Sequence, residues 1–70
     1  PIDKAISVTV YDVSGRVVKT LVNNQVYSQG VHEVQWDGTT DGGVSAASGT
    51  YLYTLKFGNF AQTKTMVLLK

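Results

Sequence analysis

The sequence has no cysteine, so disulfide bonds, thiolate zinc sites and a cysteine nucleophile are all excluded. Histidine occurs once, at His32, where it shares a strand face with Val34 and Trp36, which indicates packing rather than chemistry. No spacing of serine and aspartate places a nucleophile beside a base. The longest apolar run near the C-terminus, residues 66–69, is far too short to cross a bilayer. We therefore expect no enzymatic activity, no cofactor and no transmembrane segment.

Charge of either sign is sparse, and no region concentrates it. Charged residues make up 16% of the chain, the net charge is +1, and the basic side chains are spread along the sequence. Nucleic acids and lipid surfaces are usually bound by basic residues gathered on one face, so neither partner is expected. We expect no secretory signal within these residues, because residues 1–4 lack a basic stretch followed by an apolar one. With 70 residues, we expect a single domain with a modest core.

What the sequence does contain is a period-two alternation of apolar and polar residues, which predicts half-buried β-strands. In residues 5–11, Ile6, Val8 and Val10 share one face, and their β-branched side chains suit a pleated surface. A turn is expected over residues 12–15, because its aspartate can bond backbone amides and its glycine adopts a positive φ at little cost.

The returning strand is expected over residues 16–22, with Val18 and Leu21 as its buried members. In a regular strand, residues on one face are separated by two positions, and Val18 and Leu21 are not. A β-bulge or irregular pairing is therefore expected near residues 19–20. Similar patterns predict the remaining segments: a connection over 23–30, a strand over 31–36, a glycine-rich loop over 37–49 with room for a short edge strand over 44–47, a strand over 50–57, a hairpin turn at Gly58-Asn59 and a strand over 60–70. No segment has a sustained helical period, and closely spaced strands indicate an all-β antiparallel sandwich.

Four blocks of the sequence, taken in order, look like a known family. They are residues 8–18, 30–38, 48–55 and 64–70. With these blocks the chain resembles the type A C-terminal sorting domain of the type IX secretion system. It is also similar to the immunoglobulin-like domain of the flagellar hook-capping protein, in which the same blocks occur. The resemblance extends over residues 8–70, nearly the whole chain.

The resemblance implies an immunoglobulin-like antiparallel β-sandwich with Greek-key connections and no catalytic activity. It implies that the module directs a secreted cargo protein, attached on its N-terminal side, through the type IX secretion system. The partners would be secretion machinery proteins at the outer membrane, and the destination would be the cell surface or the medium, reached through the periplasm. The alternative is an immunoglobulin-like structural or accessory module, of the hook-cap type or attached to a secreted hydrolase.

Two departures from the family pattern bear on this choice. Family members usually have one more strand before the first turn, whereas this chain begins at Pro1. A missing first strand would leave an uncovered edge, and exchange of strands between copies would then give an oligomer. The loop over residues 37–43 is closer to the hook-cap form, whereas the ending at residues 68–70 favours sorting.

The terminal strand and the first turn supply the candidate recognition residues. As the resemblance implies, the export machinery reads the last strand, and a partner strand can add to such an edge. The lysines would supply charge, and Met66 and Leu68 would fill pockets of the partner if they face outward. A purely structural interpretation instead places Val67 and Leu69 in the core. The candidate set is Lys64, Met66, Val67, Leu68, Leu69, Lys70, Gly15 and Arg16.

The sequence also offers residues for a calcium site and for a carbohydrate-binding surface, and each set has a simpler structural interpretation. Asp37 and Asp41 flank a glycine-containing loop and are weak candidates for calcium, but capping of turns through nearby amides is the favoured interpretation, so no metal is expected. An exposed aromatic strip would suit a carbohydrate-binding module, but alternating strand positions favour the core. The aromatic residues concerned are Trp36, Tyr51, Tyr53, Phe57 and Phe60.

Overall fold

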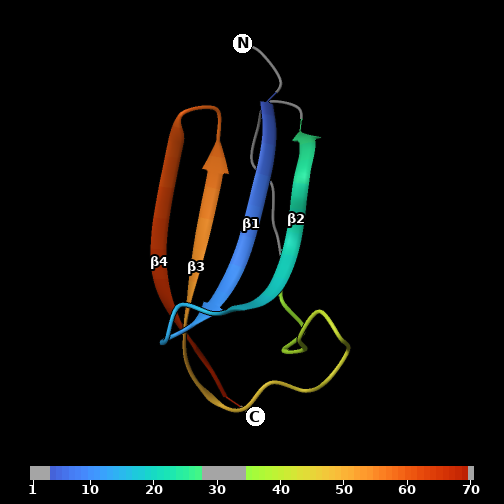
Figure 1. Cartoon of the computed structure of the whole chain (residues 1–70), viewed down its shortest axis with the longest axis vertical. Helices are drawn as coiled ribbons and strands as arrows, with labels where there is room; N and C mark the ends of the chain where they lie inside the picture. Colours follow the sequence, from blue (N-terminus) through green and yellow to red (C-terminus); the bar gives the residue numbers. More distant parts are fainter. Residues whose placement is uncertain (1–3, 28–34, 70) are drawn as a thin grey trace.

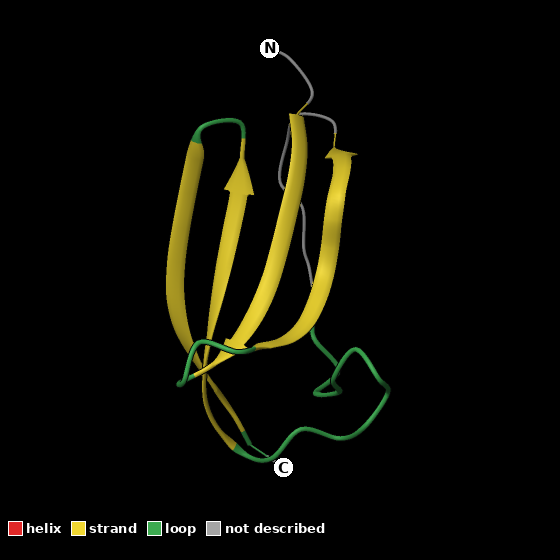
Figure 2. Ribbon diagram, viewed as in Figure 1, coloured by secondary structure: helices red, strands yellow, loops and turns green. Residues whose placement is uncertain are grey.

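The computed structural model describes residues 4–27 and 35–69, and it is an all-β structure. Its four strands are β1 (Lys4–Asp12), β2 (Val17–Tyr27), β3 (Gly49–Phe57) and β4 (Phe60–Leu68). They form one open antiparallel sheet in the order β2-β1-β3-β4, as Figures 1 and 2 show. This arrangement is consistent with a fragment of an immunoglobulin-like β-sandwich. Within the described ranges, no helix is long and apolar enough to span a membrane.

Both tight turns form where the sequence predicts them. Gly15 adopts a φ of 90° between β1 and β2, and Gly58 adopts a φ of 56° between β3 and β4. Glycine reaches this left-handed region without the steric cost that a Cβ atom brings. The β3–β4 turn brings Phe57 opposite Phe60, and their ring centroids lie 4.8 Å apart.

Strand β2 is longer than the sequence predicts. A connection was expected from residue 23 onward, but the strand continues to Tyr27 and pairs with the start of β1. The pairing requires a register shift, and Asn24 supplies it with a φ of 53°, a conformation that asparagine tolerates better than most residues. The Asn24 amide donates a hydrogen bond to Ser7 Oγ at 3.0 Å, which joins the irregular segment to β1. Pairing with β1 thus outweighs the local turn preference of these polar residues.

The irregular pairing expected near residues 19–20 is confirmed. In the register of β1 with β2, Thr20 and Val22 have partners on β1, whereas Leu21 between them has none; Val18 is skipped in the same way. An extra residue on one strand is a β-bulge, and it re-aims the side chains around it. Both skipped residues pack against the hydrophobic core, as their predicted burial requires.

The core lies on one face of the sheet, here called the core face, and the other face is called the outer face. Val10 is fully buried, and it packs with Tyr51 of β3 and with Ala46 of the loop before β3. That loop therefore covers part of the core face, toward the lower end of the sheet in Figure 1. Partly buried side chains surround this centre; they are Val18, Leu21, Trp36, Tyr53, Met66 and Leu68.

The predicted strand over residues 31–36 and the single histidine, His32, fall mainly outside the described residues. Of that segment, only Gln35 and Trp36 are described, and neither is in a strand. The short edge strand expected over residues 44–47 is reduced to one isolated bridge between Thr39 and Ser45.

Candidate functional site

Strand β4 is the edge strand that holds most of the predicted recognition residues. All nine of its residues pair with β3 in an unbroken antiparallel register, from Phe57 opposite Phe60 to Gly49 opposite Leu68. No other strand of the described chain pairs with it, so its outer edge is open. An open edge presents backbone N–H and C=O groups to which another strand can bond.

The side chains at the end of β4 face the opposite way from the structural interpretation that placed Val67 and Leu69 in the core. Met66 lies opposite the buried Tyr51, and both Met66 and Leu68 pack against the core. Because successive strand residues point to opposite faces, Val67 points away from the core face. The exposed fractions are 64% for Val67 and 84% for Leu69, so the interpretation that placed these two residues in the core is wrong. The idea that Met66 and Leu68 point outward into a partner's pockets fails for the same reason.

The two predicted lysines of this segment are Lys64 and Lys70. Lys64 is exposed and lies opposite Tyr53, on the core side of the edge strand. Lys70 lies outside the described residues.

The turn between β1 and β2 is held by one carboxylate. Asp12 Oδ1 accepts hydrogen bonds from the Ser14 hydroxyl at 2.6 Å, the Ser14 amide at 2.9 Å and the Arg16 amide at 3.0 Å. The Ser14 hydroxyl, followed by the Arg16 backbone amide, lowers the pKa of Asp12 below its ordinary value. The turn is therefore rigidly capped, and Gly15 and the side chain of Arg16 are left exposed.

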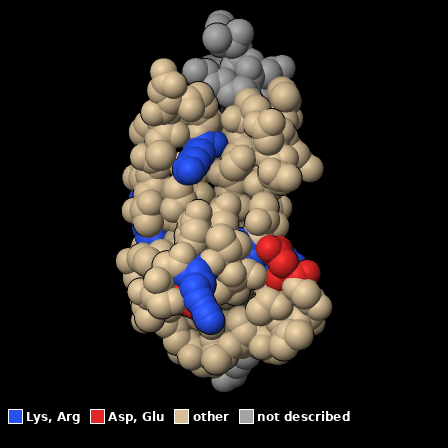
Figure 3. Space-filling view, viewed as in Figure 1, with Lys and Arg blue, Asp and Glu red and all other residues tan. Residues whose placement is uncertain are grey.

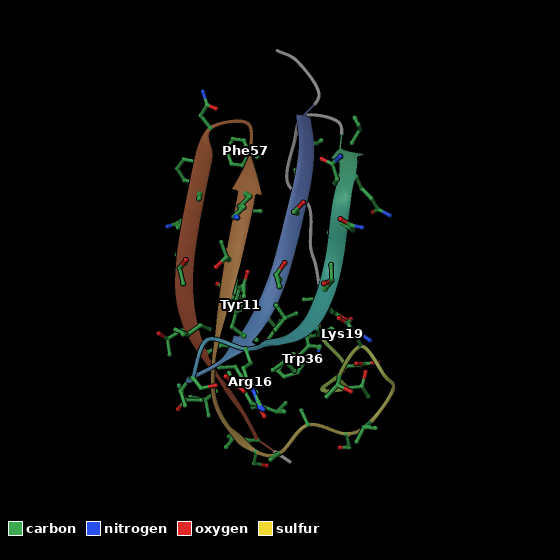
Figure 4. All side chains as sticks on the ribbon, in the orientation of Figure 1. Tyr11, Arg16, Lys19, Trp36 and Phe57 are labelled. Carbon is green, nitrogen blue, oxygen red and sulfur yellow. The ribbon has the colours of Figure 1, made fainter. Side chains whose placement is uncertain are left out.

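The structure brings this turn and the end of β4 to the same end of the sheet. Asp12 lies opposite Tyr51, and Tyr51 lies opposite Met66, so the three residues form one row across β1, β3 and β4. Figure 4 shows Arg16 at this end. Gly15 and Arg16 thus share an end of the molecule with the exposed Val67 and Leu69.

The two aspartates weighed for calcium are each engaged by protein groups. Asp37 Oδ1 accepts from the Thr39 hydroxyl at 2.7 Å and the Thr39 amide at 3.0 Å, which confirms the predicted turn cap. The Thr39 hydroxyl is the main cause that lowers the pKa of Asp37 below its ordinary value, followed by the Thr39 amide. Asp41 does not cap its own turn as expected; its Oδ1 accepts from the Thr20 amide of β2 at 3.0 Å. Within the part of the chain that the structure describes, no three acidic, histidine or cysteine residues gather to hold a metal.

A lysine that the sequence analysis did not single out ties the loop to the sheet. Lys19 Nζ donates hydrogen bonds to the Thr40 carbonyl at 3.3 Å and to Thr39 Oγ1 at 3.4 Å. The Asp41 amide also donates to the Val18 carbonyl of β2 at 3.0 Å. No local sequence signal marks Lys19 for this role, because its partners lie some 20 residues further along the chain.

The aromatic strip considered for carbohydrate binding is largely core. The Trp36 and Tyr51 rings meet edge to face with centroids 5.1 Å apart, and Tyr53 packs against the same cluster. The Trp36 indole N–H donates to the Thr39 carbonyl at 2.8 Å, and the Tyr51 hydroxyl donates to the Ala47 carbonyl at 2.6 Å. These three rings fix the loop on the core face, whereas Phe57 and Phe60 pair with each other outside this cluster, and Phe60 is 46% exposed.

The chain also matches a known protein family. The family model described as the FlgD Ig-like domain matches residues 1–59. No curated protein and no solved structure matches the chain. Strand β4 begins at Phe60 and so lies beyond the matched residues.

Proposed function

Because the chain belongs to the FlgD Ig-like domain family, we propose that it is a non-catalytic accessory module of a larger protein that binds a partner along the edge of β4. The family is one of structural domains, and it gives no indication of an enzyme. The observation that carries the proposal is the unbroken nine-residue register of β4 with β3, which leaves a regular outer edge.

The two edges of the sheet are not equally suited to accept another strand. Strand β2 has three register irregularities and a residue with positive φ, Asn24, and such irregularities disfavour regular pairing with a further strand. Strand β4 has no irregularity, and its exposed Val67 offers an apolar side chain next to the open edge. Backbone hydrogen bonds would give a partner strand affinity, and Val67 and Leu69 would give it selectivity.

In its finer form, the proposal is that the partner belongs to the type IX secretion machinery and that β4 is the sorting strand. The block at residues 64–70 supports this, because it resembles the terminal strand of sorting domains and its Val67 and Leu69 are exposed. Gly15 and Arg16, at the same end of the sheet, are proposed as a second contact. The proposed destination is the cell surface or the medium, reached through the periplasm.

A localisation assay tests this role. A fluorescent carrier with a periplasmic export signal is joined to the N-terminal side of the chain and produced in a host with a type IX system. The test variant is the double substitution V67D and L69D, which changes exposed side chains and leaves the core untouched. The matched control is V26D, because Val26 lies on the opposite edge strand and is exposed to a similar degree, 69% against 64% for Val67. The parent and V26D are expected outside the cell, and the β4 variant in the periplasm.

Three outcomes of this assay would contradict the sorting role or the part that β4 plays in it. Export of the parent that persists in a host without the secretion machinery would refute the sorting role. Export of all three forms would show that the end of β4 is not recognised. Retention of all three, with each folded by circular dichroism, would reject sorting and leave the accessory module, whose partner would then be sought by crosslinking from residue 67.

A further inference from the structure

The outer face of the sheet carries a row of threonines that crosses all four strands. Thr20 of β2 lies opposite Thr9 of β1, Thr9 lies opposite Thr54 of β3, and Thr54 lies opposite Thr63 of β4. Neighbouring strands are about 4.8 Å apart, so the four threonines form one row across the sheet. The hydroxyl oxygens of Thr54 and Thr63 are 3.0 Å apart and share a hydrogen bond.

A shallow groove of about 230 Å³ lies along the part of this row formed by Thr20, Thr9 and Thr54. The side of the groove toward the β1–β2 turn has Tyr11, whose ring lies over β1 and β3 in Figure 4. The buried Val22 contributes an apolar patch to its lining. Polar side chains make up the rest of the lining; they are Ser7, Thr9, Thr20, Asn23, Thr54 and Lys56.

The chemistry of the lining selects a class of ligand. A hydroxyl group both donates and accepts hydrogen bonds, as the hydroxyl groups of a sugar do. Ser7 Oγ already accepts a hydrogen bond from the Asn24 amide, so its own O–H is left to donate into the groove. Tyr11 adds a half-buried ring with a polar tip, which suits a ligand that is apolar on one side and polar on the other.

The charge of the groove restricts the class of ligand further. Lys56 is the one cationic side chain in the lining, it is exposed, and no carboxylate lines the groove within the described chain. A single cation among hydroxyl groups complements a single anionic substituent on a polyhydroxylated chain. A nucleic acid would need many basic groups in one patch, whereas Figure 3 shows a mostly uncharged face with scattered basic side chains.

We propose that this groove binds an acidic saccharide chain, with a uronate carboxylate at Lys56 and sugar hydroxyl groups along Thr9 and Thr54. The site is separate from the open edge of β4 and from the aromatic residues of the core face. It does not depend on the partner proposed for β4, so the two proposals can fail independently.

The test is binding of the full chain to polygalacturonate, with dextran as the neutral comparison, measured by affinity electrophoresis and by NMR shift mapping. K56Q removes a charge-assisted hydrogen bond, which is the stronger kind, so it is expected to weaken polygalacturonate binding about tenfold. T54V removes a neutral hydrogen bond and is expected to weaken binding about fivefold. The matched controls are K64Q and T50V. Lys64 is an exposed lysine on the other face of the neighbouring strand, and Thr50 is an exposed threonine outside the groove lining. Circular dichroism confirms that each variant is folded.

Weakening by K56Q and T54V with no change in K64Q and T50V would support the groove, provided that shifts gather at outer-face residues of β1 and β3. Equal weakening by K56Q and K64Q would show binding by overall charge and overturn the proposal. Equal binding to dextran and polygalacturonate would overturn the acidic assignment. Absence of binding to either polymer by the folded parent would overturn the site itself.

Discussion

The ammonium group of Lys19 lies 3.3 Å from the carbonyl oxygen of Thr40 and donates a hydrogen bond to it. This contact joins β2 to the loop between β2 and β3, and Lys19 also contributes to lowering the pKa of the neighbouring Asp37. A protein cation thus bonds to the loop that Asp37 and Asp41 made a weak candidate for calcium. Asp41 completes the attachment by accepting from the Thr20 amide.

Substitution of Lys19 by methionine is expected to destabilise the domain, because it removes both hydrogen bonds to the loop but keeps the aliphatic stem. A loss of about 1 kcal/mol is expected for partly buried bonds of this kind, which lowers Tm by roughly 4–8 °C in a domain of this size. Differential scanning fluorimetry measures the change, with K56M as the control, because Lys56 is exposed and away from the loop. A chelator should not change Tm in the parent protein. A Tm that falls with chelator and recovers with calcium would contradict this account.

Tyr51 is expected to contribute through its hydroxyl group as well as its ring. In Y51F the ring contact with Trp36 is kept and the 2.6 Å hydrogen bond to the Ala47 carbonyl is lost. Loss of that bond should cost about 1 kcal/mol in the free energy of unfolding, measured by urea denaturation followed by Trp36 fluorescence. The control is Y53F, which removes a tyrosine hydroxyl from the same strand and keeps the bond of Tyr51 to Ala47. Equal losses in both variants would show that the Ala47 bond has no stabilising role.

The strands that the sequence predicted well are those in which local signals and long-range pairing agree. Strand β1 alternates cleanly, and the β3–β4 hairpin has its own turn signal at Gly58. The second half of β2 was missed because Asn23 and Asn24 read as turn formers. Their strand conformation comes from pairing with the start of β1, and no local pattern records that.

Which side chains of β4 face the core could not be predicted from the sequence, for a related reason. Both alternating sets of its last residues are apolar, Met66 and Leu68 in one, Val67 and Leu69 in the other. Periodicity identifies the two sets but not which one meets the core. The register with β3 decides it, because Tyr51 is buried and lies opposite Met66. The contacts of Lys19 with the loop and the alignment of the threonines likewise depend on which segments the fold makes neighbours, so the sequence alone does not show them.

The orientation of β4 is tested by two alanine substitutions next to each other. M66A is expected to cost about 1–2 kcal/mol, because a half-buried side chain is removed from the core cluster. V67A should change the free energy of unfolding by less than about 0.5 kcal/mol, since Val67 is exposed. Urea denaturation at neutral pH measures both. If V67A is the more damaging of the two, the assigned facing of β4 is wrong.

The pKa shifts of Asp12 and Asp37 predict how stability depends on pH. Hydrogen bonds from the Ser14 and Thr39 hydroxyls, together with backbone amides, lower the pKa of each carboxyl in the folded state. A carboxyl with a lowered pKa binds fewer protons when folded than when unfolded. Its stabilising contribution is therefore complete above the unfolded pKa and is lost as the pH falls below about 4. Tm measured between pH 7 and pH 2 should decline on the acid side.

The double variant D12N and D37N isolates this contribution. Asparagine keeps an acceptor oxygen at each turn but has no charge to lose, so the variant should be less stable than the parent at pH 7. Its Tm should then fall less steeply on acidification, and the two Tm curves should converge toward pH 2. D41N is the comparison, because the Asp41 carboxylate also accepts from a backbone amide, but from Thr20 of β2 and not within its own turn. A double variant whose Tm declines as steeply as that of the parent would place the acid sensitivity in other groups.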